Sequence, residues 1–397
     1  MEKWVTFLDV LKTPIRNGLT KPKGIRGTGV KMIAMGEIFA KARISDMEMD
    51  RVPVTEKEMA NCGIEAGDLL FARQSLVLEG AGKCSIVTEV SEPTVFESHL
   101  IRARIDKEKA DPYFIFYYFN SSHGRENIKT IVEQVAAAGI RGSDLVKLSI
   151  PCPEVSEQRR VARILRSIDE RIENNEKIND NLQQQAATIF RQWFVANPES
   201  EKWPLVTLDS LTSLVSRGIA PKYTDDSTQI VLNQKCIRDH YIDISLGRRH
   251  KAKVINEKWL QYGDLLINST GEGTLGRAAQ VWFTPENMTV DSHVTVVRPK
   301  NQLLLFYIGL WGISHEREIE SLHTGSTGQT ELPRERVKTM ELRLPDNDTL
   351  TRFNAVIAPM VSLVIANQQE NMRLANIRDA LLPKLMSGEI DASDIDR

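Results

Sequence analysis

The sequence predicts an α+β protein of two pseudo-symmetric globular domains separated by a long two-helix coiled coil. Three observations predict this fold: landmarks that recur in both halves of the chain, short strand-like runs broken by turn residues, and two long heptad patterns. The expected organisation is one globular domain, a central helical spacer, a second globular domain, and a distal helical spacer with a C-terminal tail. The corresponding ranges are residues 1–152, 153–196, 197–345 and 346–397.

The internal repeat is collinear over both halves. A Lys-Trp pair opens each copy at Lys3-Trp4 and Lys202-Trp203, and a glycine follows at Gly18 and Gly218. The segment GDLL then recurs at 67–70 and 263–266, and the dipeptide Ser-His recurs at 98–99 and 292–293. Slowly drifting offsets between such landmarks are typical of two copies that differ by loop insertions and deletions.

Each globular part combines strands and helices. The runs DLLFARQS, CSIVTEV and HLIRARI in the first copy are short, apolar and bounded by turn residues, as are DLLINST, AAQVWF and HVTVVRP in the second. Apolar stretches of helical character lie between them at 112–122 and 303–320. This mixture predicts the α+β class.

A long helix follows each globular part. Residues 154–194 contain neither glycine nor proline, and their apolar residues recur with steps of four and three, as a coiled-coil seam requires. This helix should extend roughly 48 Å. The seam of the first helix comprises Val161, Leu165, Ile168, Ile172, Asn175, Asn179, Leu182, Ala186, Ile189 and Trp193. The equivalent seam of the second helix comprises Phe353, Ile357, Met360, Val364, Asn367, Asn371, Leu374, Arg378, Leu381 and Leu385.

The four seam asparagines, Asn175, Asn179, Asn367 and Asn371, recur at matching places. A buried asparagine lowers stability but specifies register, so we expect these residues to align the two helices on each other. The spacing leaves parallel and antiparallel pairing open. The alternative is that each helix packs on its own domain, and Pro359 is expected to kink or separate the first turn of the second helix.

Charge is distributed unevenly, although the chain of 397 residues has a net charge of only −2. Residues 1–43 carry nine basic and three acidic side chains, and residues 235–258 carry seven and three. Basic patches on two similar domains favour binding to a duplex with two half-sites. Four widely spaced cysteines and the lack of a signal peptide or an 18-residue apolar run predict free thiols and a soluble, cytoplasmic protein.

No motif in the sequence predicts catalysis. The glycine pattern GEGTLG at 271–276 is followed by a strand-like run and not by a helix, so we interpret it as a turn. The histidines have no metal-ligand spacing, and the repeated Ser-His pair is interpreted as a structural strand position. We therefore expect no catalytic residue, no metal and no cofactor bound by this chain.

The whole chain resembles the specificity subunits of type I restriction–modification systems. The segments at 150–194 and 376–390 are similar to the helical segments of that family, and the two Lys-Trp openings resemble its target-recognition domains. The resemblance implies antiparallel helices, a chain without a catalytic site, and methyltransferase partners that carry the S-adenosylmethionine chemistry. It also implies a motor-nuclease subunit as a further partner, and double-stranded DNA as the ligand.

Candidate DNA-binding side chains lie on loops beside the repeated glycine turns, where they could reach base edges. They are Lys21, Lys23, Arg26, Arg73, Gln74 and Arg141 in the first domain, and Lys222, Tyr223, Asn268, Ser269, Arg277, Thr327 and Gln329 in the second. Candidates for contact with a methyltransferase subunit are Arg159, Arg160, Arg163, Phe190 and Phe194. The competing hypothesis is a coiled-coil scaffold whose end domains bind protein, and it predicts weak salt dependence of any DNA binding.

Overall fold

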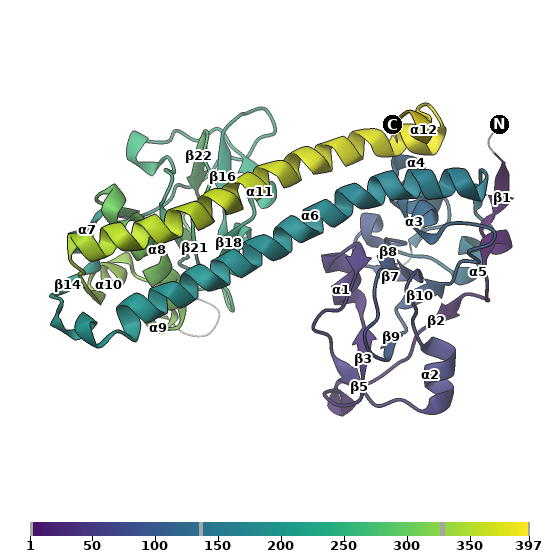
Figure 1. The fold of residues 1–397 in the computed structure, drawn as a ribbon, viewed down its shortest axis with the longest axis horizontal. Helices are drawn as coiled ribbons and strands as arrows, with labels where there is room; N and C mark the ends of the chain where they lie inside the picture. The colour runs from purple at the N-terminus through teal and green to yellow at the C-terminus, as the bar shows by residue number, and fades with distance from the viewer. Residues whose placement is uncertain (1–2, 135–137, 326–329, 396–397) are drawn as a thin grey trace. The chain divides into compact units, whose positions relative to one another are not determined.

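The structure, a computed structural model, describes residues 3–134, 138–325 and 330–395. The chain divides into two compact units, one formed by Met1–Ile172 with Met372–Arg397 and the other by Glu173–Asn371. Each unit contains one α+β domain and a part of both long helices (Figure 1).

The first unit is built on a five-stranded sheet in the order β2-β10-β6-β8-β4. Its strands are β2 (Arg16–Asn17), β10 (Leu100–Ala103), β6 (Leu69–Ala72), β8 (Cys84–Val87) and β4 (Arg43–Ile44). A second sheet, in the order β5-β3-β9, pairs β3 with β9 in parallel. The smaller pairings are β1 with β13, and β12 with both β11 and β7. The bounds of these strands are β5 (Arg51–Val52), β3 (Val30–Ile33), β9 (Thr94–Phe96), β1 (Trp4–Thr6), β13 (Ser149–Pro151), β11 (Glu133–Gln134), β12 (Ala138–Gly139) and β7 (Gln74–Ser75).

The second unit repeats this plan with a four-stranded sheet in the order β15-β23-β20-β21. Its strands are β15 (Thr212–Arg217), β23 (Val294–Pro299), β20 (Leu265–Asn268) and β21 (Ala278–Gln280). The sheet β19-β16-β22 again contains a parallel pair, β16 with β22, and β14 pairs with β24 as β1 pairs with β13. The bounds are β19 (Arg248–Arg249), β16 (Ile230–Leu232), β22 (Met288–Val290), β14 (Leu205–Thr207) and β24 (Glu341–Arg343), with the hairpin β17 (Ile237–Arg238) and β18 (Tyr241–Ile242).

Helices cover these sheets. The first unit has α1 (Met35–Ala40), α2 (Glu56–Cys62), α3 (Pro112–Asn120), α4 (Ser122–Lys129) and α5 (Gly142–Leu145). The second has α7 (Leu208–Leu211), α8 (Leu305–Ser314), α9 (Glu316–Ser321) and α10 (Arg334–Lys338). Aromatic residues of α3 and β6 meet in the first core, where the ring centroids of Phe71 and Phe119 lie 5.1 Å apart. The predicted strands and helices of both copies are thus present, and the shared strand order confirms the internal repeat.

The repeated sequence landmarks have structural reasons. A Cβ on Gly18 would lie 2.1 Å from the carbonyl oxygen of Phe96, and one on Gly218 would lie 1.9 Å from that of Val290. Only glycine permits the parallel approach of these chain segments. The aspartate of each GDLL turn is buried in both domains. Each accepts two hydrogen bonds from an arginine that lies in, or directly after, the neighbouring strand of the sheet (β23 or β10). These pairs are Asp68 with Arg104 and Asp264 with Arg298.

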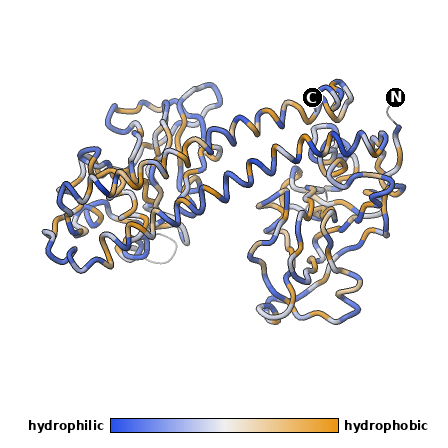
Figure 2. The backbone as a smooth tube through the Cα atoms, viewed as in Figure 1, coloured by the Kyte–Doolittle hydropathy of each residue, from blue (hydrophilic) through white to orange (hydrophobic). Residues whose placement is uncertain are grey.

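Two long helices carry the heptad seams: α6 (Val155–Phe190), followed by a π-helical turn at Arg191–Val195, and α11 (Asn347–Ser387). Every predicted seam position is buried or half-buried in the unit to which it belongs. Hydrophobic and hydrophilic residues alternate along both helices (Figure 2). Helix α11 continues through Pro359, so the first turn of the second helix is not a separate element. Pro359 and Ala355 are both exposed, so the carbonyl that loses its helical partner can be hydrated.

The seam asparagines pair antiparallel within the second unit. The amide of Asn367 donates to the Asn179 side chain at 2.9 Å, and that of Asn175 donates to Asn371 at 2.9 Å and to Glu370 at 2.7 Å. In the first unit the seam arginine Arg378 meets Asp169 at 2.9 Å, and Asp169 also accepts a hydrogen bond from Tyr117 at 2.6 Å. Arg378 therefore has a buried carboxylate as its partner within the seam.

We expect Asn179→Leu alone to lower the free energy of unfolding by about 1–3 kcal/mol, because the buried amide of Asn367 loses its acceptor. The double variant Asn179→Leu/Asn367→Leu should be close to the wild type or more stable, since both polar groups are removed together. Urea unfolding measures both. Gln184→Leu, at an exposed position of α6, is the control and should change stability little. Equal losses in the single and double variants would contradict the pairing.

Helix α11 is long and apolar enough to cross a membrane, by length and composition alone. Its seam residues instead pack within protein: Phe353, Ile357 and Val364 lie in the core of the second unit, and Leu385 lies in that of the first. In the segment predicted as a C-terminal tail, Ala392 begins α12 (Ala392–Ile395) and is 2% exposed.

Candidate nucleic-acid interface

Three of the side chains predicted to contact DNA in the first domain lie together where β6 ends. The backbone N–H of Arg73 donates to the carbonyl of His99 at 2.8 Å, and the Arg73 carbonyl accepts from Ile140 at 2.9 Å. This brings Arg73, Gln74 and Arg141 to the same edge of the domain. Gln74 and Arg141 are exposed and Arg73 is half-buried, so the edge offers two cationic groups and an amide. The Arg141 guanidinium also forms an exposed ion pair with Glu133 at 2.8 Å.

The other predicted cations of the first domain are more engaged than the sequence indicated. Lys21 forms an ion pair with Glu58 at 2.8 Å, and Arg26 forms one with Asp50 at 2.8 Å. Lys23, between them, is exposed. Nearby carboxylates thus compensate part of the basic excess that residues 1–43 show in sequence. These carboxylates are close in space but lie outside residues 1–43, so a charge count over that segment does not reveal them.

Two predicted residues of the second domain are buried, which corrects their assignment as direct DNA contacts. Asn268 and Ser269 are both 0% exposed. The Asn268 amide donates to the carbonyl of Gln234 at 3.1 Å, and the Ser269 hydroxyl lies 2.6 Å from that of Thr295. Both faces of β20 are covered here, so the chain first reaches the surface at Thr270, which is half-buried.

The remaining predictions for the second domain stay untested as contacts. Lys222 and Tyr223 are exposed, and Arg277 is half-buried after the turn at 271–276. That segment is indeed a turn, with positive φ at Gly271, Gly273 and Gly276. Thr327 and Gln329 lie outside the described residues.

A basic patch surrounds Tyr223. We use this name for the exposed residues Lys222, Arg248, Arg249, Lys251 and Lys253. The guanidinium of Arg248 stacks 3.5 Å from the centre of the Tyr223 ring, and the backbone N–H of Lys251 donates to the carbonyl of Lys222 at 2.9 Å. None of the five has an ion-pair partner within residues 138–325 or the other described segments. The charge run at 235–258 is visible in the sequence, whereas the grouping of these residues with Lys222 and Tyr223 is visible only in the structure.

The predicted partner residues divide into two groups. The first group lies on α6, where Arg159 and Arg163 are exposed and Arg160 is half-buried. A groove of about 280 Å³ is lined by Arg159 and Arg163 together with Arg166 and Tyr113. Phe190 and Phe194 are 1% and 6% exposed, which corrects their assignment as partner contacts. The Phe194 ring packs 4.7 Å from that of Phe353, so these phenylalanines belong to the core of the second unit.

The described residues contain neither an exposed thiol nor a cluster of metal-ligating side chains. The four cysteines are free and buried, and burial raises the pKa of each thiol, so they remain protonated and unreactive. Among the described residues, no group of three or more His, Cys, Asp or Glu side chains could hold a metal ion.

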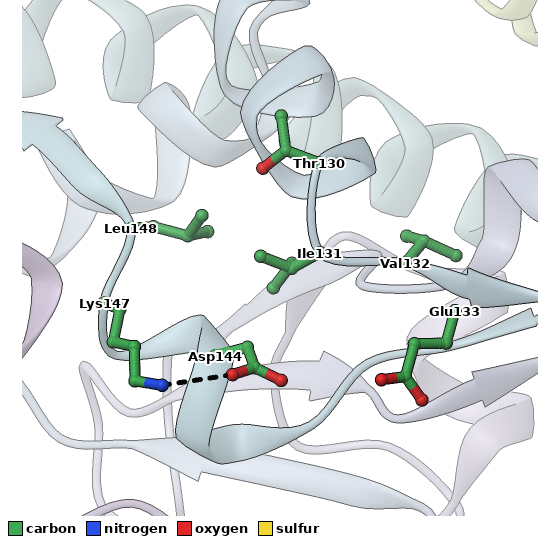
Figure 3. A pocket seen from close by; sticks show the side chains of 7 residues that line it. All are labelled: Thr130, Ile131, Val132, Glu133, Asp144, Lys147 and Leu148. Atoms are coloured by element: carbon green, nitrogen blue, oxygen red, sulfur yellow. Dashed lines mark hydrogen bonds and ion pairs between the residues drawn. The ribbon is translucent and has the colours of Figure 1, made fainter.

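A surface depression of about 340 Å³ lies in the first unit (Figure 3). Its lining combines the apolar side chains of Ile131, Val132 and Leu148 with the ion pair of Lys147 and Asp144 at 3.4 Å.

This architecture defines a class of protein: two repeated α+β domains, each packed on part of an antiparallel two-helix coiled coil. Residues 15–184 match the family model described as type I restriction modification DNA specificity domain. The chain is similar to specificity subunits of type I restriction–modification systems.

Two curated proteins are similar in sequence to this chain over most of its length. It is 25% identical to the type I restriction enzyme MjaIX specificity subunit of Methanocaldococcus jannaschii, over 86% of this chain and 82% of that protein. It is 21% identical to the type I restriction enzyme HindI specificity subunit of Haemophilus influenzae, over 83% and 88%. The crystal structure of the S subunit from M. genitalium has the same fold, with a TM-score of 0.57, 14% identity, and coverage of 97% of this chain and 96% of that one.

Proposed function

We propose that this chain is the non-catalytic, sequence-specific DNA-binding subunit that reads a two-part, asymmetric site and directs methyltransferase and nuclease-translocase subunits to it. One observation carries the proposal: the two domains share one strand order but present different side chains at equivalent edges. Arg73 and Gln74 of the first domain are half-buried and exposed, whereas their counterparts in the second domain, Ser269 and Thr270, are buried and half-buried. Two similar domains with different reading edges suit two different half-sites.

The coiled coil is then the spacer that sets the gap between the half-sites. The paired asparagines favour one register, and a fixed register gives a gap of constant length. The S-adenosylmethionine chemistry belongs, in this proposal, to the methyltransferase partner, and the complex works in the cytoplasm. The groove of Arg159 and Arg163 is the proposed contact for a methyltransferase subunit.

The basic patch should supply non-specific affinity for DNA. We expect Arg248→Ala/Arg249→Ala to weaken binding about equally for all sequences, because phosphate contacts carry no sequence information. The slope of log affinity against log salt should fall by roughly one for each arginine that contacts a phosphate. Fluorescence anisotropy over a salt series measures this. Lys202→Ala removes an exposed lysine paired with Glu199 and serves as the control. An unchanged slope in the double variant would exclude the patch from the interface.

The function is tested by co-expressing the chain with a methyltransferase subunit from the same locus and mapping methylated adenines. A single split motif with a constant unspecified gap would support the proposal and supply both half-sites. A stable complex without methylation would call for direct DNA binding by the full-length chain over a salt series. Binding that neither discriminates between sequences nor weakens with salt would contradict the proposal and favour a protein-binding scaffold.

A further inference from the structure

Two exposed histidines occupy equivalent positions in the two domains. His99 lies in the turn between β9 and β10, and His293 lies in the turn between β22 and β23. The carbonyl of each accepts a 2.8 Å hydrogen bond from the residue that follows the repeated strand, Arg73 in one domain and Ser269 in the other. The interpretation of the Ser-His pair as a strand position is therefore wrong, since both histidines lie in turns.

Each imidazole ring is held from the same side. Nδ1 of His99 lies 3.2 Å from Oε1 of Gln74, and Nδ1 of His293 lies 2.8 Å from the hydroxyl of Thr270. Thr270 in turn donates to Oε1 of Gln234 at 3.0 Å, so its hydroxyl oxygen accepts from His293. An amide oxygen only accepts, and hence Nδ1 is the donor in both rings. This arrangement leaves Nε2 of each ring as the nitrogen available to a ligand.

The fold does not require these rings. Both side chains are exposed, and the turns are already closed by backbone hydrogen bonds. The neighbouring positions differ between the domains: Arg73 and Gln74 stand where the second domain has Ser269 and Thr270. A side chain shared by two domains with different reading edges suits a feature common to every half-site, which is the phosphate backbone.

We propose that His99 and His293 are a matched pair of phosphate-contacting residues, one for each half-site, that position each domain on the duplex. The proposal rests on the DNA-reading function proposed above. A phosphate oxygen accepts hydrogen bonds, so the ring donates from Nε2 as the imidazolium while Nδ1–H stays bonded to Gln74 or Thr270. The pair sets orientation, and the differing neighbours are left to discriminate between bases.

The test uses the full-length chain with His99→Gln, His293→Gln and the double variant. Affinity is measured for the mapped target and for an unrelated duplex of equal length, over a salt series. Each single variant should bind both duplexes about tenfold more weakly, with a shallower salt slope and an unchanged methylation motif. His123→Gln, an exposed histidine of α4, is the matched control and should bind as the wild type does.

A second variant separates the possible roles. His99→Arg restores a cationic donor and should recover most of the affinity for both duplexes. A motif altered at one half-site would show base reading and overturn the phosphate assignment, as would affinities and slopes equal to those of the wild type. Thermal unfolding verifies that each variant is folded. Wild-type chain that fails to bind DNA would overturn the proposed function itself, whereas wild-type binding with unaffected variants would overturn only this inference.

Discussion

Asp264→Ala is expected to lower the free energy of unfolding by about 3–5 kcal/mol, because it leaves the guanidinium of Arg298 desolvated without its carboxylate. Asp264 is 0% exposed, and the Arg298 side chain is 11% exposed. The pair is bidentate, with Nε to Oδ1 and Nη2 to Oδ2 both at 2.7 Å. Chemical unfolding of the full-length chain, followed by tryptophan fluorescence, measures the loss.

The same pair explains why aspartate recurs in both GDLL turns. Asp264 also accepts from the backbone N–H of Gln261 at 2.8 Å, and Arg298 donates to the carbonyls of Glu257 and Trp259 at 3.0 and 2.7 Å. One ion pair thus connects the turn before β20, strand β23 and the segment at 257–259. Removing the carboxylate affects all of these bonds together.

Two further variants make this prediction specific. Asp264→Leu/Arg298→Met replaces both charges with apolar groups and should be much closer to the wild type than Asp264→Ala. Asp225→Ala, at an exposed position of the same domain, should change stability by less than about 0.5 kcal/mol. A small effect of Asp264→Ala, equal to that of the exposed control, would contradict the structural role of the pair.

Gly218→Ala is expected to destabilise the second domain by about 3 kcal/mol and to reduce DNA binding with it. The added Cβ would lie 1.9 Å from the carbonyl oxygen of Val290 and 2.4 Å from that of Asp291. Both atoms are backbone, so neither can rotate away, and the segment carrying Lys222 and Tyr223 must move relative to β22. Thermal unfolding and DNA binding of the same preparation measure the two effects.

The repeat supplies an internal comparison. Gly18→Ala places a Cβ 2.1 Å from the carbonyl oxygen of Phe96 and should have a similar effect on the first domain. Gly24→Ala is the matched control, because no atom lies within 4 Å of the added Cβ. Gly18→Ala and Gly218→Ala variants as stable as Gly24→Ala would show that these close approaches can relax without cost.

The sequence predicted the repeated strands, the two long helices and their seam because these features are local and periodic. A heptad pattern needs only the residues of one helix, and the buried positions of α6 and α11 follow it closely. The recurrence of Gly18 with Gly218 and of the two GDLL turns was visible for the same reason. Their cause, a backbone approach and a buried ion pair, was visible only in the structure.

Local patterns in the sequence were therefore enough to predict two similar α+β domains and two long helices with matching seams. The antiparallel pairing of the seam asparagines was observed only in the structure. The tertiary structure alone decided which polar residues reach the surface. Asn268 and Ser269 are buried by partners distant in sequence, whereas His99 and His293 are exposed on turns that two strands hold in place. It likewise placed Phe190 in a core and gave Arg378 its partner Asp169. Burial depends on contacts between segments far apart in the chain, and no local pattern records those contacts.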